Sequence, residues 1–178
     1  MRILLHAFTV MFLITFVAYP AAAEPEGKLE IPKSLQIEHA AIHTTLAEAI
    51  KVQGPVGASA KTLAEALHSH FDREEGIALP PLGVLAPLAD GVPIPEAQLS
   101  RALSLSDSLR RVMPQVLGEH SRIGRAVESL REAAKAEHMT KYEELADQVA
   151  LHAQHEEEVL YPAAMLVGDL IRARQRAD

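Results

Sequence analysis

The sequence predicts an all-α protein, an up-down-up-down four-helix bundle built from a duplicated helical hairpin, with a short C-terminal helix. Three observations support this fold class. Apolar residues recur at spacings of three and four along several segments, which is the period of an amphipathic helix. No segment keeps the two-residue alternation that is typical of a strand. One pattern of histidine, glutamate and proline occurs twice, about 82 residues apart, and this spacing indicates an internal repeat.

The first predicted hairpin contains two helices. Pro32 and Ser34 mark the start of the first helix, and the Gly54-Pro55 pair follows its end. The second helix is expected from about Ser59, and residues 76–81, rich in glycine and proline, are expected to close it. The stripes that are expected to face the core are Leu35, His39, Ile42, Leu46 and Ala49 on the first helix, and Leu63, Ala66, Leu67, His70 and Glu74 on the second.

A proline-rich segment separates the two hairpins. Residues 80–95 hold five prolines, so we expect a long connection across the bundle. Residues 96–112 carry leucines at helical spacing, and Pro114 is then expected to break or restart the helix.

The second predicted hairpin has the same organisation. Its first helix carries an apolar stripe that runs from Val116 to Leu130, and its second helix runs from about Thr140 to just before Pro162. An amphipathic tail, residues 163–176, is expected to pack across one end of the bundle.

The first 23 residues have the features of a secretory signal peptide. Arg2 precedes a mostly apolar run, and Ala21-Ala22-Ala23 provides small residues for cleavage before Glu24. The alternative is an uncleaved N-terminal membrane anchor, because the apolar run is just long enough to span a bilayer. We therefore expect a bundle domain over 24–178 that is exported, periplasmic or secreted, and that has no membrane association once the signal is cleaved.

Composition excludes several classes of function. The chain has no cysteine, which removes thiolate catalysis, iron–sulfur ligation and acylation as a lipoprotein. Its formal net charge is −7, so nucleic acid is not an expected partner, since phosphate contacts need clustered lysine and arginine.

The repeated pattern places imidazoles and carboxylates together. Positions i and i+4 share one face of a helix, so His70 with Glu74, and His152 with Glu156, can each face one cavity. His39 and His120 can add one imidazole from each of the other two helices. The resulting four imidazoles and two carboxylates are too many for one ordinary zinc site, whereas two carboxylates can bridge two ions. A donor set without thiolate favours iron. The predicted metal ligands are His39, His70, Glu74, His120, His152 and Glu156.

These residues and their spacing resemble the hemerythrin-like family of His-His-Glu cation-binding domains. The resemblance covers residues 35–162, and the phrases His-Phe-Asp-Arg-Glu-Glu (70–75) and His-Ala-Gln-His-Glu-Glu-Glu-Val-Leu-Tyr-Pro (152–162) carry it. It implies a non-haem di-iron centre with an oxo or hydroxo bridge that takes a small diatomic ligand, O2 or NO. Oxygen-carrying relatives have a second histidine on the third helix, where this chain has Gly124. His43 is therefore a candidate for a seventh ligand.

The neighbours of the predicted ligands have simpler expected roles. Glu75 and Glu157 are expected to face outward or to orient a ligating imidazole. Glu38 and Glu119 can be surface charges or can support the ligands, and the surface is the preferred expectation. Tyr161 is expected to pack at the end of the bundle, and a hydrogen bond near the site is the alternative.

Three functions are consistent with this pattern. The first is binding or sensing of O2 or another small oxygen or nitrogen ligand in the cell envelope, without turnover. The second is a stress-protection protein that handles nitric oxide or peroxide, or that donates iron, as some relatives with this ligand set do. The third is a structural or storage bundle in which the metal only cross-links helices.

Overall fold

The computed structural model describes residues 27–177, and this part of the chain is entirely helical apart from turns and short connections. The four main helices are α1 (Lys33–Ala49), α2 (Pro55–Arg73), α4 (Glu96–Ala136) and α5 (Thr140–His155). Residues 27–177 contain no strand, so the predicted all-α fold class is confirmed. None of the helices in this part combines the length and the apolar composition needed to cross a bilayer. The predicted leader, 1–23, lies outside the described residues.

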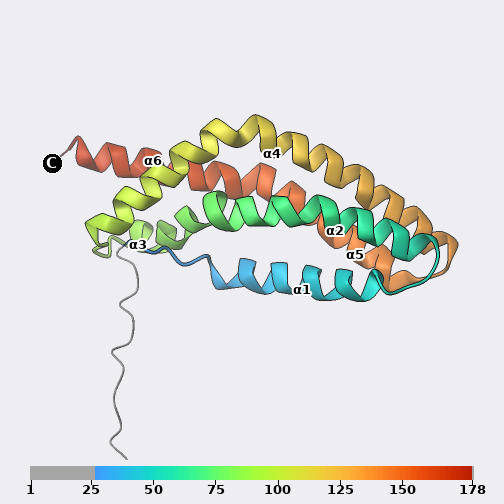
Figure 1. Ribbon diagram of the computed structural model, residues 1–178. Coiled ribbons are helices and arrows are strands. Elements are labelled where there is room, and N and C mark those ends of the chain that lie inside the picture. Colours follow the sequence, from blue (N-terminus) through green and yellow to red (C-terminus); the bar gives the residue numbers. More distant parts are fainter. Residues whose placement is uncertain (1–26, 178) are drawn as a thin grey trace, which may run out of the picture.

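The helices form a bundle in which each main helix packs on two neighbours. α1 contacts α2, α2 contacts α4, α4 contacts α5, and α5 contacts α1, so the contacts close a ring around the bundle (Figure 1). Short connections join α1 to α2 and α4 to α5, and each of these pairs is a hairpin of antiparallel helices (Figure 1). The predicted duplicated hairpin is therefore present.

Two wide turns lie at matching positions of the repeat. α2 continues into the π-helix η1 (Glu74–Ala78), and α5 continues into the π-helix η3 (Glu156–Leu160). Each turn ends on a backbone bond that spans five residues: the amide of Leu79 donates to the carbonyl of Glu74 over 2.9 Å, and the amide of Tyr161 donates to the carbonyl of Glu156. π-turns of this kind are frequent at functional sites. Both begin at a glutamate that the sequence predicts as a ligand.

The segment between the hairpins is largely helical. It comprises the 3-10 helix η2 (Pro80–Val84) and the short helix α3 (Leu85–Asp90). Both pack at one end of the molecule, where η2 contacts α4 and α6 (Tyr161–Gln175).

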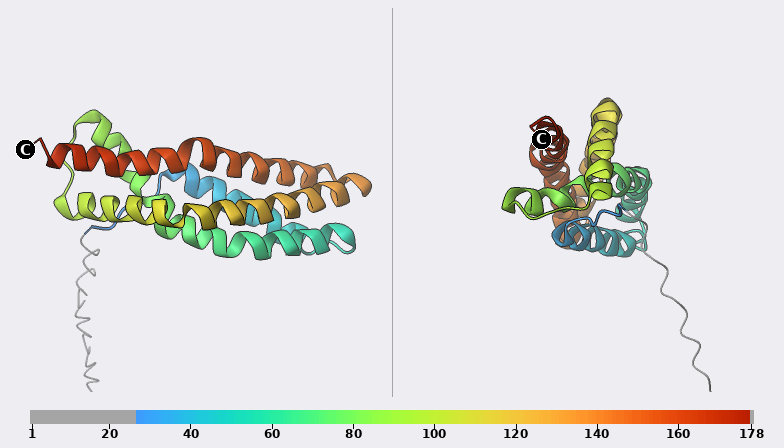
Figure 2. Two further views of the ribbon diagram at one scale, coloured as in Figure 1. Left: turned by 90° about the horizontal axis from the view of Figure 1, so that it is seen from above. Right: turned by 90° about the vertical axis from the view of Figure 1, so that its left-hand side faces the viewer.

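Two sequence expectations about helix ends are wrong. Pro114 does not end a helix, because α4 runs through it from Glu96 to Ala136 as one bent rod (Figure 1). The C-terminal tail does not cross the bundle either. Instead, α6 prolongs α5 and η3 as one continuous rod beside α4 (Figure 2).

Close approach and buried polar contact hold α6 against α4. A Cβ at Gly168 would lie 2.7 Å from the Cβ of Ser106, so only glycine permits this separation. The Ser106 hydroxyl donates a hydrogen bond to the carbonyl of Ala164 over 2.6 Å.

Two of the three apolar clusters among the described residues lie on either side of a polar layer, and the third packs α3, α4 and α6 together at one end of the bundle. The first cluster includes Ile42, Leu67, Phe71, Ile123 and Val149. The second includes Leu35, Leu79, Val116 and Tyr161. On each of the four main helices, the predicted ligand histidine lies along the chain between a member of one cluster and a member of the other. The polar layer therefore crosses the bundle between two hydrophobic cores.

Candidate metal centre

The six predicted ligands gather in the buried polar layer. Their residue exposures range from 0% for Glu156 to 7% for His120. They form two groups of potential metal ligands, and within each group one donor atom per residue lies within 4.8 Å of all the others. The groups are His39, Glu74, His152 and Glu156, and His70, Glu74, His120 and Glu156. Both groups thus share the two glutamates, while each has two histidines of its own.

Each shared glutamate presents its two oxygens to different groups. For Glu74, Oε1 lies 3.3 Å from His70 Nε2, and Oε2 lies 3.7 Å from His39 Nε2. For Glu156, Oε2 lies 3.3 Å from His120 Nε2, and Oε1 lies 3.0 Å from His152 Nε2. A carboxylate with one oxygen toward each of two positions is the arrangement that bridges two ions.

The helical register explains why these side chains meet. His70 and Glu74 stand one turn apart on α2 and η1, and His152 and Glu156 stand one turn apart on α5 and η3. The remaining imidazole of each group comes from another main helix, His39 from α1 and His120 from α4. Every main helix therefore contributes one histidine, and the two that continue into π-turns also contribute a glutamate.

Four glutamates surround the cluster, and we call Glu38, Glu75, Glu119 and Glu157 the outer glutamates. Each faces the Nδ1 atom of a predicted ligand histidine on a neighbouring helix. The distances are 2.9 Å for His39 to Glu75, 3.4 Å for His70 to Glu119, 2.6 Å for His120 to Glu157 and 3.2 Å for His152 to Glu38. These pairs link α1 to η1, α2 to α4, α4 to η3 and α5 to α1. The four contacts close a ring that includes each pair of adjacent helices.

The hydrogen bonds to the outer glutamates determine which imidazole nitrogen carries the proton. A carboxylate only accepts hydrogen bonds, so the Nδ1 atoms of His39, His70 and His120 carry the proton and the Nε2 atoms turn their lone pairs inward. The Nδ1 atom of His152 lies 3.2 Å from Glu38 without making a hydrogen bond. The lone pairs then face the carboxylate oxygens of Glu74 and Glu156. Among the buried atoms without a hydrogen-bond partner are His39 Nε2, His152 Nε2 and both oxygens of Glu156. Buried acceptors that point at one another without a donor are costly, and a cation between them removes that cost.

The separations of the donors suit a metal. An ion about 2.1 Å from its ligands keeps neighbouring ligands about 3 Å apart in octahedral and about 3.4 Å apart in tetrahedral geometry. The Nε2 atoms of His70 and His120 are 3.1 Å apart, and the nitrogen-to-oxygen distances across the two shared glutamates begin at 3.0 Å. The residues present therefore fit a metal at both groups, and His39, His70, Glu74, His120, His152 and Glu156 are the side chains that can hold it.

Burial and proximity shift the acid–base properties of the cluster. Burial and the neighbouring Glu156 raise the pKa of Glu74 well above its ordinary value. Burial lowers the pKa of His39 despite its hydrogen bond to Glu75. For His120 and His152 burial acts in the same direction, but the nearby carboxylates together outweigh it and raise the pKa: Glu156 and Glu157 for His120, and Glu156 and Glu38 for His152. Perturbed titration in one buried cluster is typical of a functional site.

Glu119 is the most deeply placed of the outer glutamates. Its side chain is 3% exposed, whereas that of Glu75 is 50% exposed. Arg73 donates two hydrogen bonds to its carboxylate, over 3.2 Å and 2.9 Å, and Gln115 donates a third over 3.2 Å. Burial alone would raise the pKa of Glu119, but the bonds from Arg73 and His70 outweigh burial and lower it. Glu119 thus stays an anion behind His70.

For two of the outer glutamates and for Tyr161, the structure has the alternative that the sequence favoured less. The expectation that Glu119 and Glu38 lie at the surface is wrong for Glu119, which is buried, and incomplete for Glu38, which is 32% exposed but faces His152. Tyr161 does more than pack, because its hydroxyl donates to Glu74 Oε1 over 2.5 Å. The repeat itself held the signal for the glutamates, since Glu38 and Glu119 occupy matching positions.

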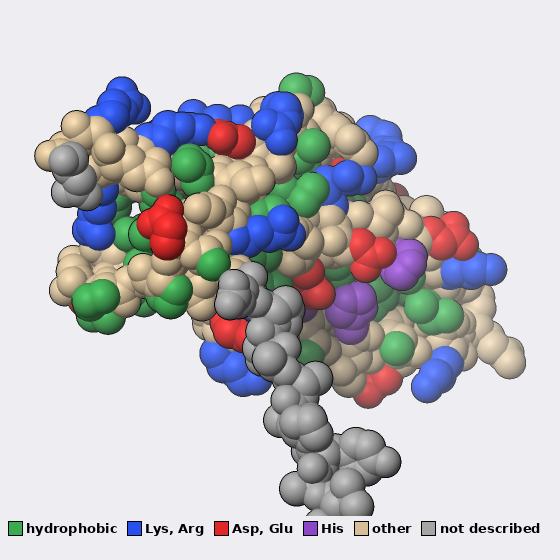
Figure 3. All heavy atoms as spheres, turned by 60° about the vertical axis from the view of Figure 1, so that its left-hand side comes forward, with side chains coloured by type: hydrophobic (Ala, Val, Ile, Leu, Met, Phe, Trp, Pro, Cys, Tyr) green, Lys and Arg blue, Asp and Glu red, His purple; other side chains and the backbone are tan. Residues whose placement is uncertain are grey.

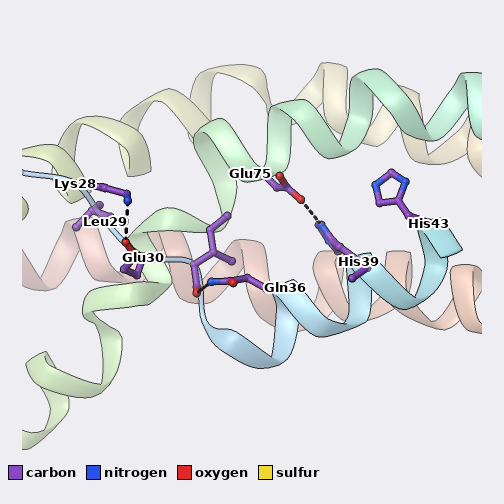
Figure 4. A pocket seen from close by; sticks show the side chains of 9 residues that line it. Lys28, Leu29, Glu30, Gln36, His39, His43 and Glu75 are labelled. Atoms are coloured by element: carbon purple, nitrogen blue, oxygen red, sulfur yellow. Dashed lines mark hydrogen bonds and ion pairs between the residues drawn. The ribbon is translucent and has the colours of Figure 1, made fainter. Parts of the chain in front are cut away.

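His43 does not join the cluster. Its side chain is exposed, it belongs to neither group of ligands, and its ring makes an edge contact with Phe71 at 4.9 Å between centroids. It lines a groove of about 600 Å³ together with His39, Glu75 and residues 28–31 (Figure 4). Histidine and acidic side chains lie close together on the face drawn in Figure 3. The groove therefore lies beside the His39 side of the cluster.

Fold and site together define a class of protein: an all-α bundle whose buried histidine and glutamate side chains can hold a metal ion. No protein-family model, no curated protein and no solved structure matches the chain. The bundle and the cluster are compatible with a hemerythrin-like site, and that likeness rests on the ligand residues and their arrangement.

Proposed function

We propose that this protein binds two iron ions in the cluster and uses them to bind or sense O2 or another small oxygen or nitrogen ligand in the cell envelope. The observation that carries the proposal is the orientation of Glu74 and Glu156, each of which turns one oxygen to each pair of histidines. A site for one ion has no need for two shared carboxylates and four imidazoles.

Iron is the metal that this donor set favours. Imidazole and carboxylate without thiolate suit iron better than copper(I), and four imidazoles do not suit calcium or magnesium, which prefer oxygen shells. Ferrous iron supplies redox chemistry and open coordination positions for small ligands. The chain supplies the rest: it fixes the imidazoles through the outer glutamates, excludes bulk water by burying the cluster, and leaves a groove beside His39.

The groove supports an exchangeable site over a purely structural one. A metal that only cross-links helices needs no approach from solvent, whereas His39 and Glu75 line an open hollow (Figure 4). Turnover of nitric oxide or peroxide remains the alternative that the same donor set would serve. Steady-state consumption of either compound with a reductant separates turnover from stoichiometric binding.

Metal content is the first test. We expect two iron ions per chain by elemental analysis of the purified protein, and new absorption bands when the ferrous form meets air or nitric oxide. His70→Ala should lower the iron content, while His68→Ala, two residues away on the same helix and 81% exposed, should not. Glu74→Ala should leave fewer than one ion per chain, because both groups share this residue. A colourless wild-type protein without iron would refute the proposal.

The cell-envelope location rests on the N-terminal sequence. Mass determination of the protein recovered from the periplasmic fraction is expected to give a chain that begins at Glu24. A chain that keeps its first 23 residues and sediments with membranes would instead support the anchor.

A further inference from the structure

The internal repeat is broken at one position that faces the cluster. Tyr161 follows the π-turn of the second hairpin, and Leu79 follows the π-turn of the first. Each lies five residues after a shared glutamate and directly before a proline, and both side chains are fully buried. The second hairpin thus carries a hydroxyl where the first carries a methyl group.

The hydroxyl makes the two shared glutamates unequal. Tyr161 donates to Glu74 Oε1 over 2.5 Å. Leu79 has no donor to offer, and both oxygens of Glu156 are without a hydrogen-bond partner among the described residues. In a bridge between two ions, one oxygen of Glu74 is therefore already engaged, while both oxygens of Glu156 are free to bind.

The hydroxyl also lies nearer to one metal position than to the other. Glu74 Oε1 is the oxygen that faces His70, and the Tyr161 hydroxyl is 3.3 Å from His120 Nε2. The Tyr161 ring stacks on that of His120 at 5.8 Å between centroids. At the other position an apolar ring takes the corresponding place, because Phe71 stacks on His39 at 4.3 Å.

We propose that Tyr161 is a positioning residue that makes the two metal positions inequivalent, weakening the one held by His70 and His120 relative to the one held by His39 and His152. A hydrogen bond donated to Glu74 Oε1 withdraws electron density from the oxygen that faces the first position, so this oxygen is the poorer metal ligand. The position held by His39 and His152 then fills first. This inference rests on the proposed dinuclear site.

The test compares Tyr161→Phe with Tyr142→Phe. Both changes remove one phenol oxygen, but Tyr142 packs against the apolar cluster outside the site. Anaerobic titration of the metal-free protein with ferrous iron should give two dissociation constants. Tyr161→Phe should bring them closer together by about tenfold, the effect of one hydrogen bond to a charged group, while Tyr142→Phe should leave their ratio unchanged. In Mössbauer spectra of the ⁵⁷Fe-loaded protein, the separation between the two doublets should shrink only in Tyr161→Phe.

Other results would overturn either this inference or the proposed function. Unchanged dissociation constants and doublets in a folded Tyr161→Phe variant would overturn the inference. A visible phenolate-to-iron band in the ferric protein that disappears in this variant would also overturn it, because Tyr161 would then be a ligand. Should Tyr161→Phe fail to fold, 3-fluorotyrosine at position 161, a stronger donor of nearly the same shape, should widen the ratio; an unchanged ratio would overturn the inference. A wild-type protein that binds fewer than two ions would refute the proposed function instead.

Discussion

Removal of the Glu119 carboxylate should weaken metal binding more than removal of any other outer glutamate. Glu119 accepts from His70 at 3.4 Å and is held by Arg73 and Gln115, and its side chain is 3% exposed. Loss of such an orienting partner typically lowers metal affinity about 10–100-fold, or about 1.4–2.7 kcal/mol. We expect Glu119→Ala near the upper end of this range. Glu119→Gln should fall near the lower end, because its amide oxygen still accepts hydrogen bonds.

The other outer glutamates provide a graded comparison. Solvent weakens an ion pair as exposure increases, and the side chains of Glu38, Glu157 and Glu75 are 32%, 44% and 50% exposed. Substitution of each by glutamine should therefore cost less affinity than Glu119→Gln, and Glu75→Gln should cost the least even though its contact with His39 is short.

Competition titration against a chromophoric chelator measures these affinities. Glu158→Gln is a suitable control, because Glu158 is an exposed neighbour of the site that accepts a hydrogen bond from Gln154. Circular dichroism before metal addition checks that each variant folds. Wild-type affinity in Glu119→Ala, or a greater loss in Glu75→Gln than in Glu119→Gln, would show that burial of the outer carboxylate does not set its contribution.

Three further outcomes follow from the structure. His43→Ala should keep the wild-type metal content by elemental analysis, because His43 lies outside both groups, and a loss of one ion would make it a ligand. Metal affinity should fall as the pH decreases toward 6.5 and below, because a metal binds the neutral imidazole and the raised pKa values of His120 and His152 let protons compete from above pH 6.5. An affinity that does not change between pH 8 and pH 6 would contradict the assignment of these histidines as ligands. In urea unfolding, Leu63→Ala should lower the free energy of unfolding by about 2–5 kcal/mol, because this side chain is fully buried. Ile37 is 59% exposed, so Ile37→Ala should change the free energy of unfolding by about 0.5 kcal/mol or less. Equal effects of the two substitutions would refute the assigned core.

The gathering of the six candidate ligands was predictable because it depends on periods within single helices. An i to i+4 spacing places His70 over Glu74 whatever the neighbouring helices do. A repeat then places the second pair by symmetry, so two local rules and one duplication suffice for the cluster. The same reasoning placed Leu63 and Ile42 in the core, where the structure has them.

The outer glutamates were harder to assign because their environment comes from another helix. Glu119 precedes His120 by one residue, which turns it about 100° around the helix axis. Whether that direction meets solvent or a neighbour depends on how α2 packs, and the sequence of α4 does not contain this information. The helix through Pro114 has a similar cause, since packing along α4 on both sides of the proline maintains a helix that local propensity would interrupt.

His43 shows where the i to i+4 rule no longer places a side chain in the cluster. It stands one turn from His39 and so satisfies the same local rule as the true members of the cluster. It nevertheless lies at the surface, because Ile42 and Leu46 occupy the inward-facing positions at this level and pack in the apolar cluster. Four residues turn about 40° beyond one full turn of a helix, so the i to i+4 rule alone does not decide whether a position at the edge of the inward face is buried.

The position of the polar layer between two apolar clusters has a consequence for how the protein melts. Without bound ions, repulsion among the unpartnered buried acceptors of this layer weakens the coupling between the two halves of the bundle on either side of it, and calorimetry should record a broad or split transition. Ions that draw donors from all four helices would tie both halves into one cooperative unit. The occupied protein should then unfold in a single sharp step at higher temperature, so that the heat trace itself reports whether the centre is filled.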